Sequence, residues 1–156
     1  AVVARVAGEL AALHRAALDA AAARTDADAS PAARAGVMVA ELAAALLASN
    51  RSQWMSLLLQ REFITPTASF DTIYDVAIRP TLEAFSALVA AASGTAPESI
   101  DCKALAFSLF IVASAFARNQ NTFLHFSEAA AYTAQDAAAI GRSLAAFVTG
   151  GLTQHP

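Results

Sequence analysis

Residues 100–126, with the sequence IDCKALAFSLFIVASAFARNQNTFLHF, decide the fold of this chain. Between Ala104 and Ala117 there is no charged side chain, and neither glycine nor proline interrupts the run. The run is about twice as long as a typical β-strand and shorter than the roughly 18–20 apolar residues that span a bilayer. It therefore predicts an α-helix. Because this helix is apolar on nearly every side, it must be buried on more than one side, and a partner subunit is the simplest second cover.

The composition indicates a single helical domain of a cytoplasmic protein. The 156 residues are 57% hydrophobic and 15% charged, and much of the hydrophobic content is alanine, which favours helix formation and close helix packing. The net charge of −3 argues against nucleic-acid binding by these residues themselves. The single cysteine, Cys102, excludes an internal disulfide and fits a reducing compartment. No segment reads as transmembrane and no signal-peptide layout is present, so we expect no membrane partner.

Apolar residues that recur at steps of three and four predict an all-α fold. We expect helices at about residues 1–24, 30–49, 51–63, 69–92, 100–126 and 133–149. The first of these is in helical phase from Ala1, which is not a methionine, so we expect it to continue from a preceding module.

Several residues predict how these helices begin and end. Pro80 removes the backbone bond to the Val76 carbonyl and is expected to kink the helix at 69–92. Gly94 is expected to stop that helix, and Gly150-Gly151 to end the last one. The expected N-caps are Ser30 before Pro31, then Thr95 with Glu98 or alternatively Ser99, and finally Thr133 with Asp136.

No set of residues in the sequence points to catalysis or to metal binding. The three histidines fall in separate segments, and His125 with Glu128 is only one of the paired motifs that a di-iron bundle requires. Cys102 has no second cysteine for a zinc site. We therefore predict neither enzymatic activity, nor a cofactor, nor a metal site.

Aromatic residues on three predicted helices have two interpretations. They are either ordinary core or the wall of a cavity for a small hydrophobic or amphipathic effector, with Tyr74, Gln53, Ser108 and Arg118 as polar anchors. Arg118 equally fits the polar end of its helix. The aromatic set is Trp54, Phe63, Phe70, Tyr74, Phe107 and Phe110. The predicted ligand-binding set is Gln53, Trp54, Leu58, Phe70, Tyr74, Ala77, Phe107, Ser108 and Ile111.

The last two helices predict a homodimer. In the last helix Ile140, Leu144, Phe147 and Val148 share a stripe, and the small residues at 137, 141 and 145 let another backbone come close. Two such helices from each subunit would form a four-helix bundle about a two-fold axis. The predicted interface consists of Phe116, Phe123, Ala137, Ile140, Gly141, Leu144, Phe147 and Val148.

Three segments carry a resemblance to a known family. They are residues 57–71 (LLLQREFITPTASFD), residues 78–80 (IRP) and residues 88–94 (LVAAASG). Together with the order of the helices, they resemble the C-terminal domain of TetR-type transcriptional regulators, and more specifically the CecR-like subgroup.

The resemblance implies an antiparallel bundle of about six helices that dimerises through the last two. It also implies that residues 1–156 form a ligand-binding and dimerisation domain, with a helix-turn-helix domain that would precede Ala1. The whole regulator would bind operator DNA as a homodimer through that absent domain and release it when a small molecule enters the C-terminal domain. Two alternatives remain from the residues themselves: a structural helical homodimer without a ligand, or a small helical haem or metal protein.

Overall fold

The computed structural model describes residues 2–49 and 52–154, except for the side chains of residues 52–56. Most of the described residues are helical and none lies in a β-strand, which confirms the predicted all-α fold. The elements are α1 (Val2–Arg24), α2 (Pro31–Ala48), α3 (Ser52–Ile64), α4 (Ala68–Ile73), the π-helical turn η1 (Tyr74–Ile78), α5 (Arg79–Ser93), α6 (Ile100–Arg118), α7 (Gln120–Phe126) and α8 (Ala134–Thr153).

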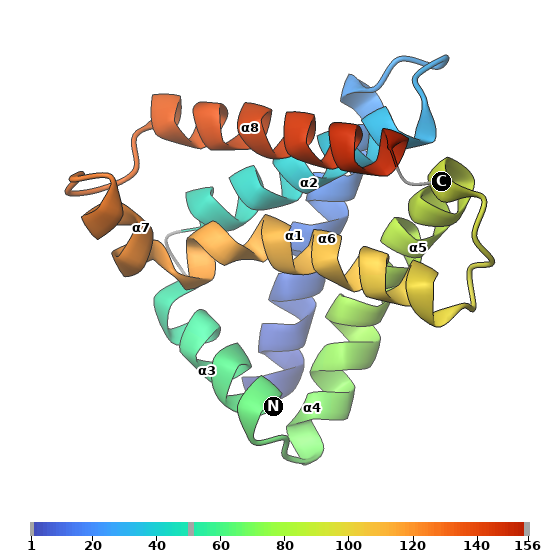
Figure 1. Cartoon of the computed structure of the whole chain (residues 1–156). Helices are drawn as coiled ribbons and strands as arrows, with labels where there is room; N and C mark the ends of the chain where they lie inside the picture. The colour runs from blue at the N-terminus through green and yellow to red at the C-terminus, as the bar shows by residue number, and fades with distance from the viewer. Residues whose placement is uncertain (1, 50–51, 155–156) are drawn as a thin grey trace.

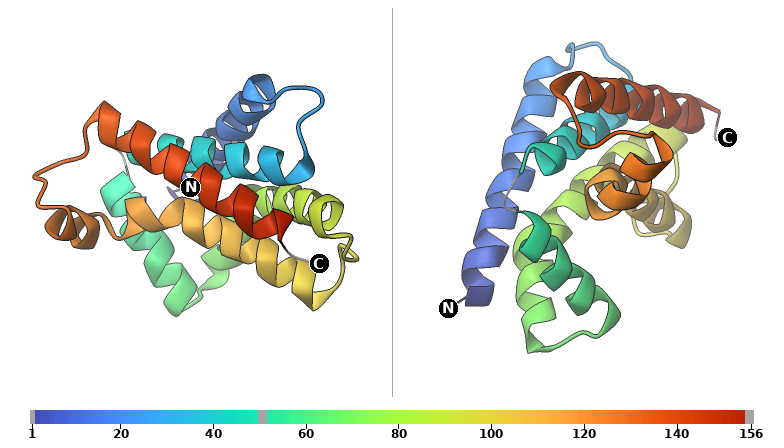
Figure 2. Two further views of the ribbon diagram at one scale, coloured as in Figure 1. Left: turned by 45° about the horizontal axis from the view of Figure 1, so that its top comes forward. Right: turned by 90° about the vertical axis from the view of Figure 1, so that its left-hand side faces the viewer.

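Helix α2 lies at the centre of the bundle, because it contacts α1, α5, α6 and α8 (Figures 1 and 2). Its buried residues are spread over the surfaces that meet these four helices, including Ala35, Val39 and Leu42, each fully or almost fully buried. Helices α6 and α8 lie side by side on one face of the molecule. The start of α1 and the α3–α4 turn lie at the same end of the molecule.

Helices α2 and α8 pack with their backbones in contact. A Cβ atom added to Gly36 would lie 2.5 Å from Thr149 Oγ1 and 2.7 Å from the Ala145 carbonyl oxygen, so only glycine fits there. Gly141 also faces α2, since its added Cβ would lie 3.7 Å from Ala40 Cβ. The backbone that comes close to this small residue in the structure is that of α2 in the same chain, whereas the sequence was interpreted as placing a partner's backbone there.

The helix predicted at 69–92 is divided by the π-helical turn η1. The Arg79 amide donates to the Tyr74 carbonyl five residues back, and Pro80 follows at the start of α5. The wider π turn takes up the irregularity that proline forces on a helix, because Pro80 has no N–H to donate. The predicted kink thus takes the form of one extra residue in a turn. As predicted, Gly94 ends the helix, in a left-handed conformation with φ of 70°.

The helix predicted at 100–126 is two helices. It breaks at Asn119, where the backbone leaves the helical region and the side-chain amide donates to the Ala115 carbonyl at 3.0 Å. Asparagine competes for backbone bonds in this way, and the break falls where the apolar run gives way to polar residues. Ser99 is the N-cap of α6, and Thr133 with Asp136 forms a full capping box at α8.

Helix α8 continues through Gly150 and Gly151 to Thr153, beyond its predicted end. Leu152, in this last turn, is only 4% exposed. Burial of a leucine contributes about 1.5–3 kcal/mol, which offsets the roughly 1 kcal/mol that each glycine costs in a helix. Tertiary packing therefore extends the helix past two residues that normally end one.

Among the described residues, three helical segments are long and apolar enough to cross a membrane by length and composition alone. The prediction that no segment meets this criterion was wrong, because it considered only uninterrupted apolar runs. Alanine raises the average apolarity of whole helices. Much of the apolar surface of α2 is used within the chain, against four neighbouring helices. The three segments are Pro31–Ala48, Ala68–Ser93 and Ile100–Arg118.

Candidate functional site

A cavity of about 50 Å³ lies where α1, α2, α3, η1 and α6 meet. Its wall is mostly apolar, and three polar side chains converge on it, which is the usual composition of a small-molecule site. The apolar lining residues are Leu10, Leu46, Leu59, Phe63, Ile78, Phe110 and Ala117, and the polar ones are His14, Ser114 and Arg118.

His14 connects α1 to the π turn beside the cavity. Its imidazole is 3% exposed, and Nδ1 lies 2.9 Å from Thr81 Oγ1 and 3.2 Å from the Ala77 carbonyl oxygen. The Phe110 ring packs edge-on against it at 6.0 Å between centroids. Burial lowers the pKa of His14 to about 4, so the imidazole is neutral at neutral pH. A movement of α1 is therefore coupled to the turn that carries the wall residue Ile78.

Arg118 is the cation of the cavity wall. Its Nε atom is buried and has no hydrogen-bond partner among the described residues. Burial lowers the pKa of the guanidinium, but arginine stays protonated in proteins. Its backbone carbonyl accepts a bond from Gln60 Nε2 on α3 at 3.4 Å. Next to it, the Ser114 hydroxyl donates to the Ile111 carbonyl at 3.1 Å.

The turn between α3 and α4 is fixed by a buried carboxylate. Glu62 is 3% exposed, and its Oε2 accepts bonds from the Thr67 backbone N–H at 3.0 Å and from Thr67 Oγ1 at 2.8 Å. Thr67 in turn caps α4 by accepting from the Ser69 amide. Phe63, adjacent to Glu62, is a wall residue of the cavity. Glu62 therefore sets the position of one end of the α3 wall.

None of the described residues in the predicted ligand-binding set lines this cavity. Ala77 is 1% exposed and contributes only its carbonyl to the His14 contact, and the exposed Ser108 hydroxyl donates to the Ala104 carbonyl. Leu58, Phe70 and Ile111 are half-buried and are not among the lining residues. Tyr74 and Phe107 line a different groove. The Gln53 and Trp54 side chains lie outside the described part of the structure.

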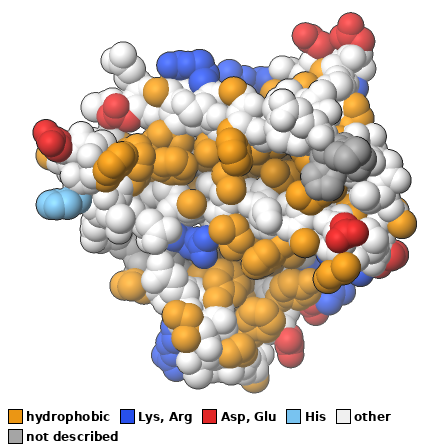
Figure 3. Space-filling view, in the orientation of Figure 1, with side chains coloured by type: hydrophobic (Ala, Val, Ile, Leu, Met, Phe, Trp, Pro, Cys, Tyr) orange, Lys and Arg blue, Asp and Glu red, His pale blue; other side chains and the backbone are white. Residues whose placement is uncertain are grey.

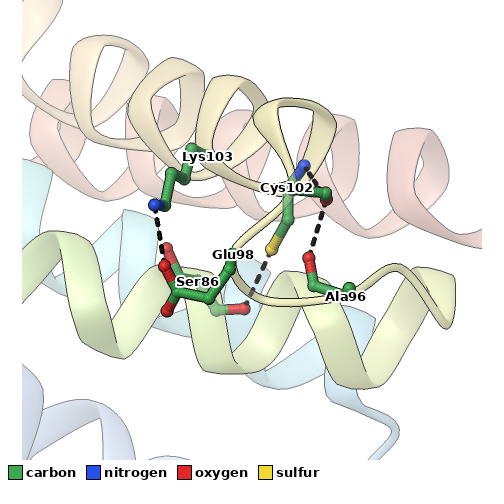
Figure 4. A network of polar contacts seen from close by, with 6 residues as sticks. Ser86, Ala96, Glu98, Cys102 and Lys103 are labelled. Atoms are coloured by element: carbon green, nitrogen blue, oxygen red, sulfur yellow. Dashed lines mark hydrogen bonds and ion pairs between the residues drawn. The ribbon is translucent and has the colours of Figure 1, made fainter.

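That groove lies between α5 and α6 and has a volume of about 760 Å³. Its basic side chains are already neutralised. Lys103 pairs with Glu98 at 2.8 Å (Figure 4), and Arg79 pairs with Asp75 and covers the Tyr74 ring. Figure 4 also shows the Cys102 thiol, which donates to the Ser86 carbonyl at 3.4 Å and ties the start of α6 to α5. Both basic side chains that line the groove are thus engaged by carboxylates of the same chain.

From the wider aromatic set, Phe63 and Phe110 do line the cavity, as does Arg118 among the suggested anchors. His14 was missed because histidines were assessed only as members of metal or catalytic motifs. The signal was its position: His14 is a polar residue on the apolar stripe that runs from Leu10 to Ala17. Such a residue must be satisfied by a partner inside the fold.

Half of the predicted dimer interface is buried inside the chain. Ile140, Leu144 and Val148 are at most 8% exposed, and Gly141 is buried as well. They lie on the face of α8 that packs on α2, so they do not reach a partner in this arrangement. Phe147, by contrast, is 71% exposed. The reason is helical geometry, since residues 140, 144 and 148 share one face and residue 147 is rotated about 100° from residue 148.

The other predicted interface residues are half-buried. Phe116 and Phe123 pack edge to face with ring centroids 4.9 Å apart, and Tyr132 stacks on Phe123 at 5.9 Å. These rings join α6 to α7 and to the segment before α8. Ala137 is also half-buried.

An exposed apolar surface covers the neighbouring outer faces of α6 and α8, where Figure 3 shows hydrophobic side chains in two bands. Ile100 and Phe107 on α6 are 78% and 53% exposed. Around Phe147 on α8 the exposed residues are small, namely Ser143, Ala146 and Gly150. We refer to Ile100, Phe107, Ser143, Ala146, Phe147 and Gly150 as the outer face. Large exposed apolar patches of this kind mark interaction sites.

The described residues contain no group of three or more His, Cys, Asp or Glu side chains placed to hold a metal ion. The cavity instead has the composition of an organic-ligand site.

The family model described as "HTH-type transcriptional dual regulator CecR, C-terminal domain" matches residues 31–152. The chain belongs to the CecR C-terminal domain family. Neither a curated protein nor a solved structure matches it. The resemblance predicted from residues 57–71 is thus confirmed, and this CecR C-terminal domain is the C-terminal domain of a TetR-type regulator, a family of transcriptional regulators rather than of enzymes. The matched range includes every cavity wall except the one formed by α1.

Proposed function

We propose that this domain senses a small-molecule effector and dimerises a cytoplasmic TetR-type regulator. In the complete regulator a helix-turn-helix domain precedes α1 and binds operator DNA, and effector binding releases that DNA. The observation that carries the proposal is the position of the cavity, because Leu10 and His14 form one of its walls on α1. A ligand there acts directly on the helix that leads to the DNA-binding domain.

The mechanism is a population shift. A ligand that prefers one position of α1 increases the population of that position by its difference in affinity between the two states. His14 transmits the shift, since its contacts with Ala77 and Thr81 tie α1 to the π turn. In a dimer, moving both copies of α1 changes the spacing of two DNA-reading heads, and operator half-sites require a fixed spacing.

The outer face supplies the dimer contact of the proposal. Phe107 and Phe147 provide large apolar side chains, and the small residues beside Phe147 let a second helix approach. Two copies of α6 and α8 would then form a four-helix bundle about a two-fold axis. This interface replaces the buried residues predicted from the sequence.

A cavity-filling substitution tests the sensing function. In Ala117→Leu the larger side chain occupies the cavity that Ala117 lines, whereas Ala12→Leu places the same side chain on the exposed surface of α1. In the regulator that carries both domains, we expect Ala117→Leu to raise the effector concentration for operator release at least tenfold. Operator affinity without effector should not change, and Ala12→Leu should respond as the wild type does.

A wild-type effector response in Ala117→Leu would refute the cavity as the sensing site. If no compound weakens operator binding by the wild-type regulator, the second candidate, a structural dimerisation module without a ligand, is favoured. The small size of the cavity, about 50 Å³, is the observation that keeps this candidate in consideration.

A further inference from the structure

The charge on the cavity wall is not balanced within the chain. Of the three polar lining residues, His14 is neutral and is bonded to Thr81 and Ala77, and the Ser114 hydroxyl is used by the Ile111 carbonyl. Arg118 is the remaining one, and its buried Nε has no partner among the described residues. The guanidinium therefore offers a donor that nothing in the described fold uses.

None of the ion pairs in the described part of the chain involves Arg118. The described ion pairs are Arg5–Glu9, Arg24–Glu41, Arg79–Asp75 and Lys103–Glu98. Glu62, on the helix opposite Arg118, directs its Oε2 to Thr67 instead. A partly buried charge without a partner is costly, and an anion that binds it recovers much of that cost. Arginine also pairs with carboxylates through two parallel bonds, which fixes their orientation.

The other residues of the cavity wall determine which kind of group is attached to the anionic group of the ligand. The Phe63 and Phe110 rings and the side chains of Leu10, Leu46 and Leu59 give it an apolar surface. A cavity of about 50 Å³ holds a few water molecules, which is less than one aromatic ring requires. A ligand of that size requires a wider cavity, and α3 is the wall that can move to widen it. Its most extensive contact is with α4, and its Phe63 is already 37% exposed.

We propose that the effector is a small monocarboxylate with an apolar body, in which the carboxylate pairs with the Arg118 guanidinium and the body packs between Phe63 and Phe110. This assignment rests on the proposed sensing function and specifies the class of compound sensed. A dicarboxylate is disfavoured because the lining carries a single cation among its described residues. A neutral compound of the same shape leaves Arg118 without its partner.

Matched pairs of compounds test this assignment on residues 1–156 by calorimetry and thermal denaturation at about pH 7.5. The probes are benzoate with benzamide and butyrate with butyramide, which differ within each pair only in charge and in the carboxylate group. We expect at least one carboxylate to bind at least tenfold more tightly than its amide. Arg118→Gln should remove this preference, Arg118→Lys should retain part of it, and the exposed Arg142→Gln should keep it in full.

A stability measurement separates loss of the charge from loss of the fold. Since Arg118 Nε has no described partner, Arg118→Gln should unfold at the wild-type temperature or above it. A fall of several degrees would show that Arg118 has a structural partner and would overturn the assignment.

The binding outcomes distinguish this inference from the sensing function on which it rests. Amides that bind as tightly as acids, or a preference that survives in Arg118→Gln, would overturn the carboxylate assignment and leave a sensing cavity for neutral compounds. Failure of both acids and amides to bind the wild-type chain would overturn it as well. In that case, operator release by any other compound would still support the sensing function.

Discussion

Replacing His14 with glutamine should make the domain less sensitive to acid. In the folded chain, burial lowers the pKa of His14 to about 4, against an ordinary value of 6.5. Below pH 6.5 the unfolded chain takes up a proton at His14, whereas the folded chain does so only near pH 4. Protonation therefore favours unfolding across this window, and stability falls as the pH falls.

The two pKa values set the size of the effect. Linkage gives a loss of about 2 kcal/mol between pH 8 and pH 5, and of about 3 kcal/mol by pH 4. For a domain of this size, about 2 kcal/mol corresponds to roughly 4–8 °C in melting temperature. Glutamine does not titrate in this range, and its amide keeps a polar group beside Thr81. His14→Gln is therefore expected to lose this part of the pH dependence, whatever its absolute stability.

The assay is urea unfolding of the wild type and His14→Gln at about pH 8, 6.5 and 5, with the exposed His125→Gln as the matched control. Hydrogen bonds to Thr133 and Lys103, respectively, lower the pKa of the exposed Asp136 and Glu98 carboxyls. Both carboxyls are present in all three proteins, so their contribution cancels in the comparison. If His14→Gln loses as much stability as the wild type between pH 8 and pH 5, His14 is not held neutral by burial, and the coupling of α1 to the π turn through a neutral imidazole is wrong.

Two further predictions concern helix packing and the dimer. Gly36→Ala should destabilise the domain by about 1–3 kcal/mol in urea unfolding, because its Cβ would overlap Thr149 and the Ala145 backbone. Gly8→Ala, which meets nothing within 4 Å, should instead stabilise it by about 0.5–1 kcal/mol, and equal effects would refute the close α2–α8 contact. Phe107→Asp and Phe147→Asp should sediment as monomers with a near-wild-type fold, whereas Arg142→Gln should sediment as a dimer. Dimeric aspartate variants would place the interface on another surface.

Much of the fold could be predicted from the sequence because its signals are local. Ser99, Thr133 and Gly94 act through hydrogen bonds or dihedral angles within a few residues of themselves, and the structure has them in their predicted roles. The ends of two helices, α6 and α8, were predicted wrongly, because local effects and distant contacts compete there. Asn119 ends α6 early through its own side chain, whereas burial of Leu152 carries α8 past two glycines.

The cavity was harder to predict because it depends on which faces of the helices meet. An apolar stripe along a helix shows that its residues face inward, but it does not show which other helix they pack against. Gly141 was therefore assigned to a partner subunit when it faces Ala40 in the same chain. His14 and Arg118 are 104 residues apart in the sequence, and only the packing of α1 on the rest of the bundle brings both to one cavity. Neither belongs to a motif that would have paired them.

The π turn at Tyr74–Ile78 has a consequence for chain length in the family. A π turn is an α-helix that holds one residue more than it needs, so deleting one residue between 74 and 78 would restore a regular helix from α4 to α5. That regular helix would then contain Pro80 in its interior, at a cost of about 3 kcal/mol or more. The extra residue of the π turn and Pro80 are therefore compatible with each other, whereas either one without the other would destabilise the helix. We expect relatives that lack the proline to be one residue shorter between positions 74 and 78. In an alignment of the family, a one-residue gap in this helix should therefore occur in the sequences without the proline.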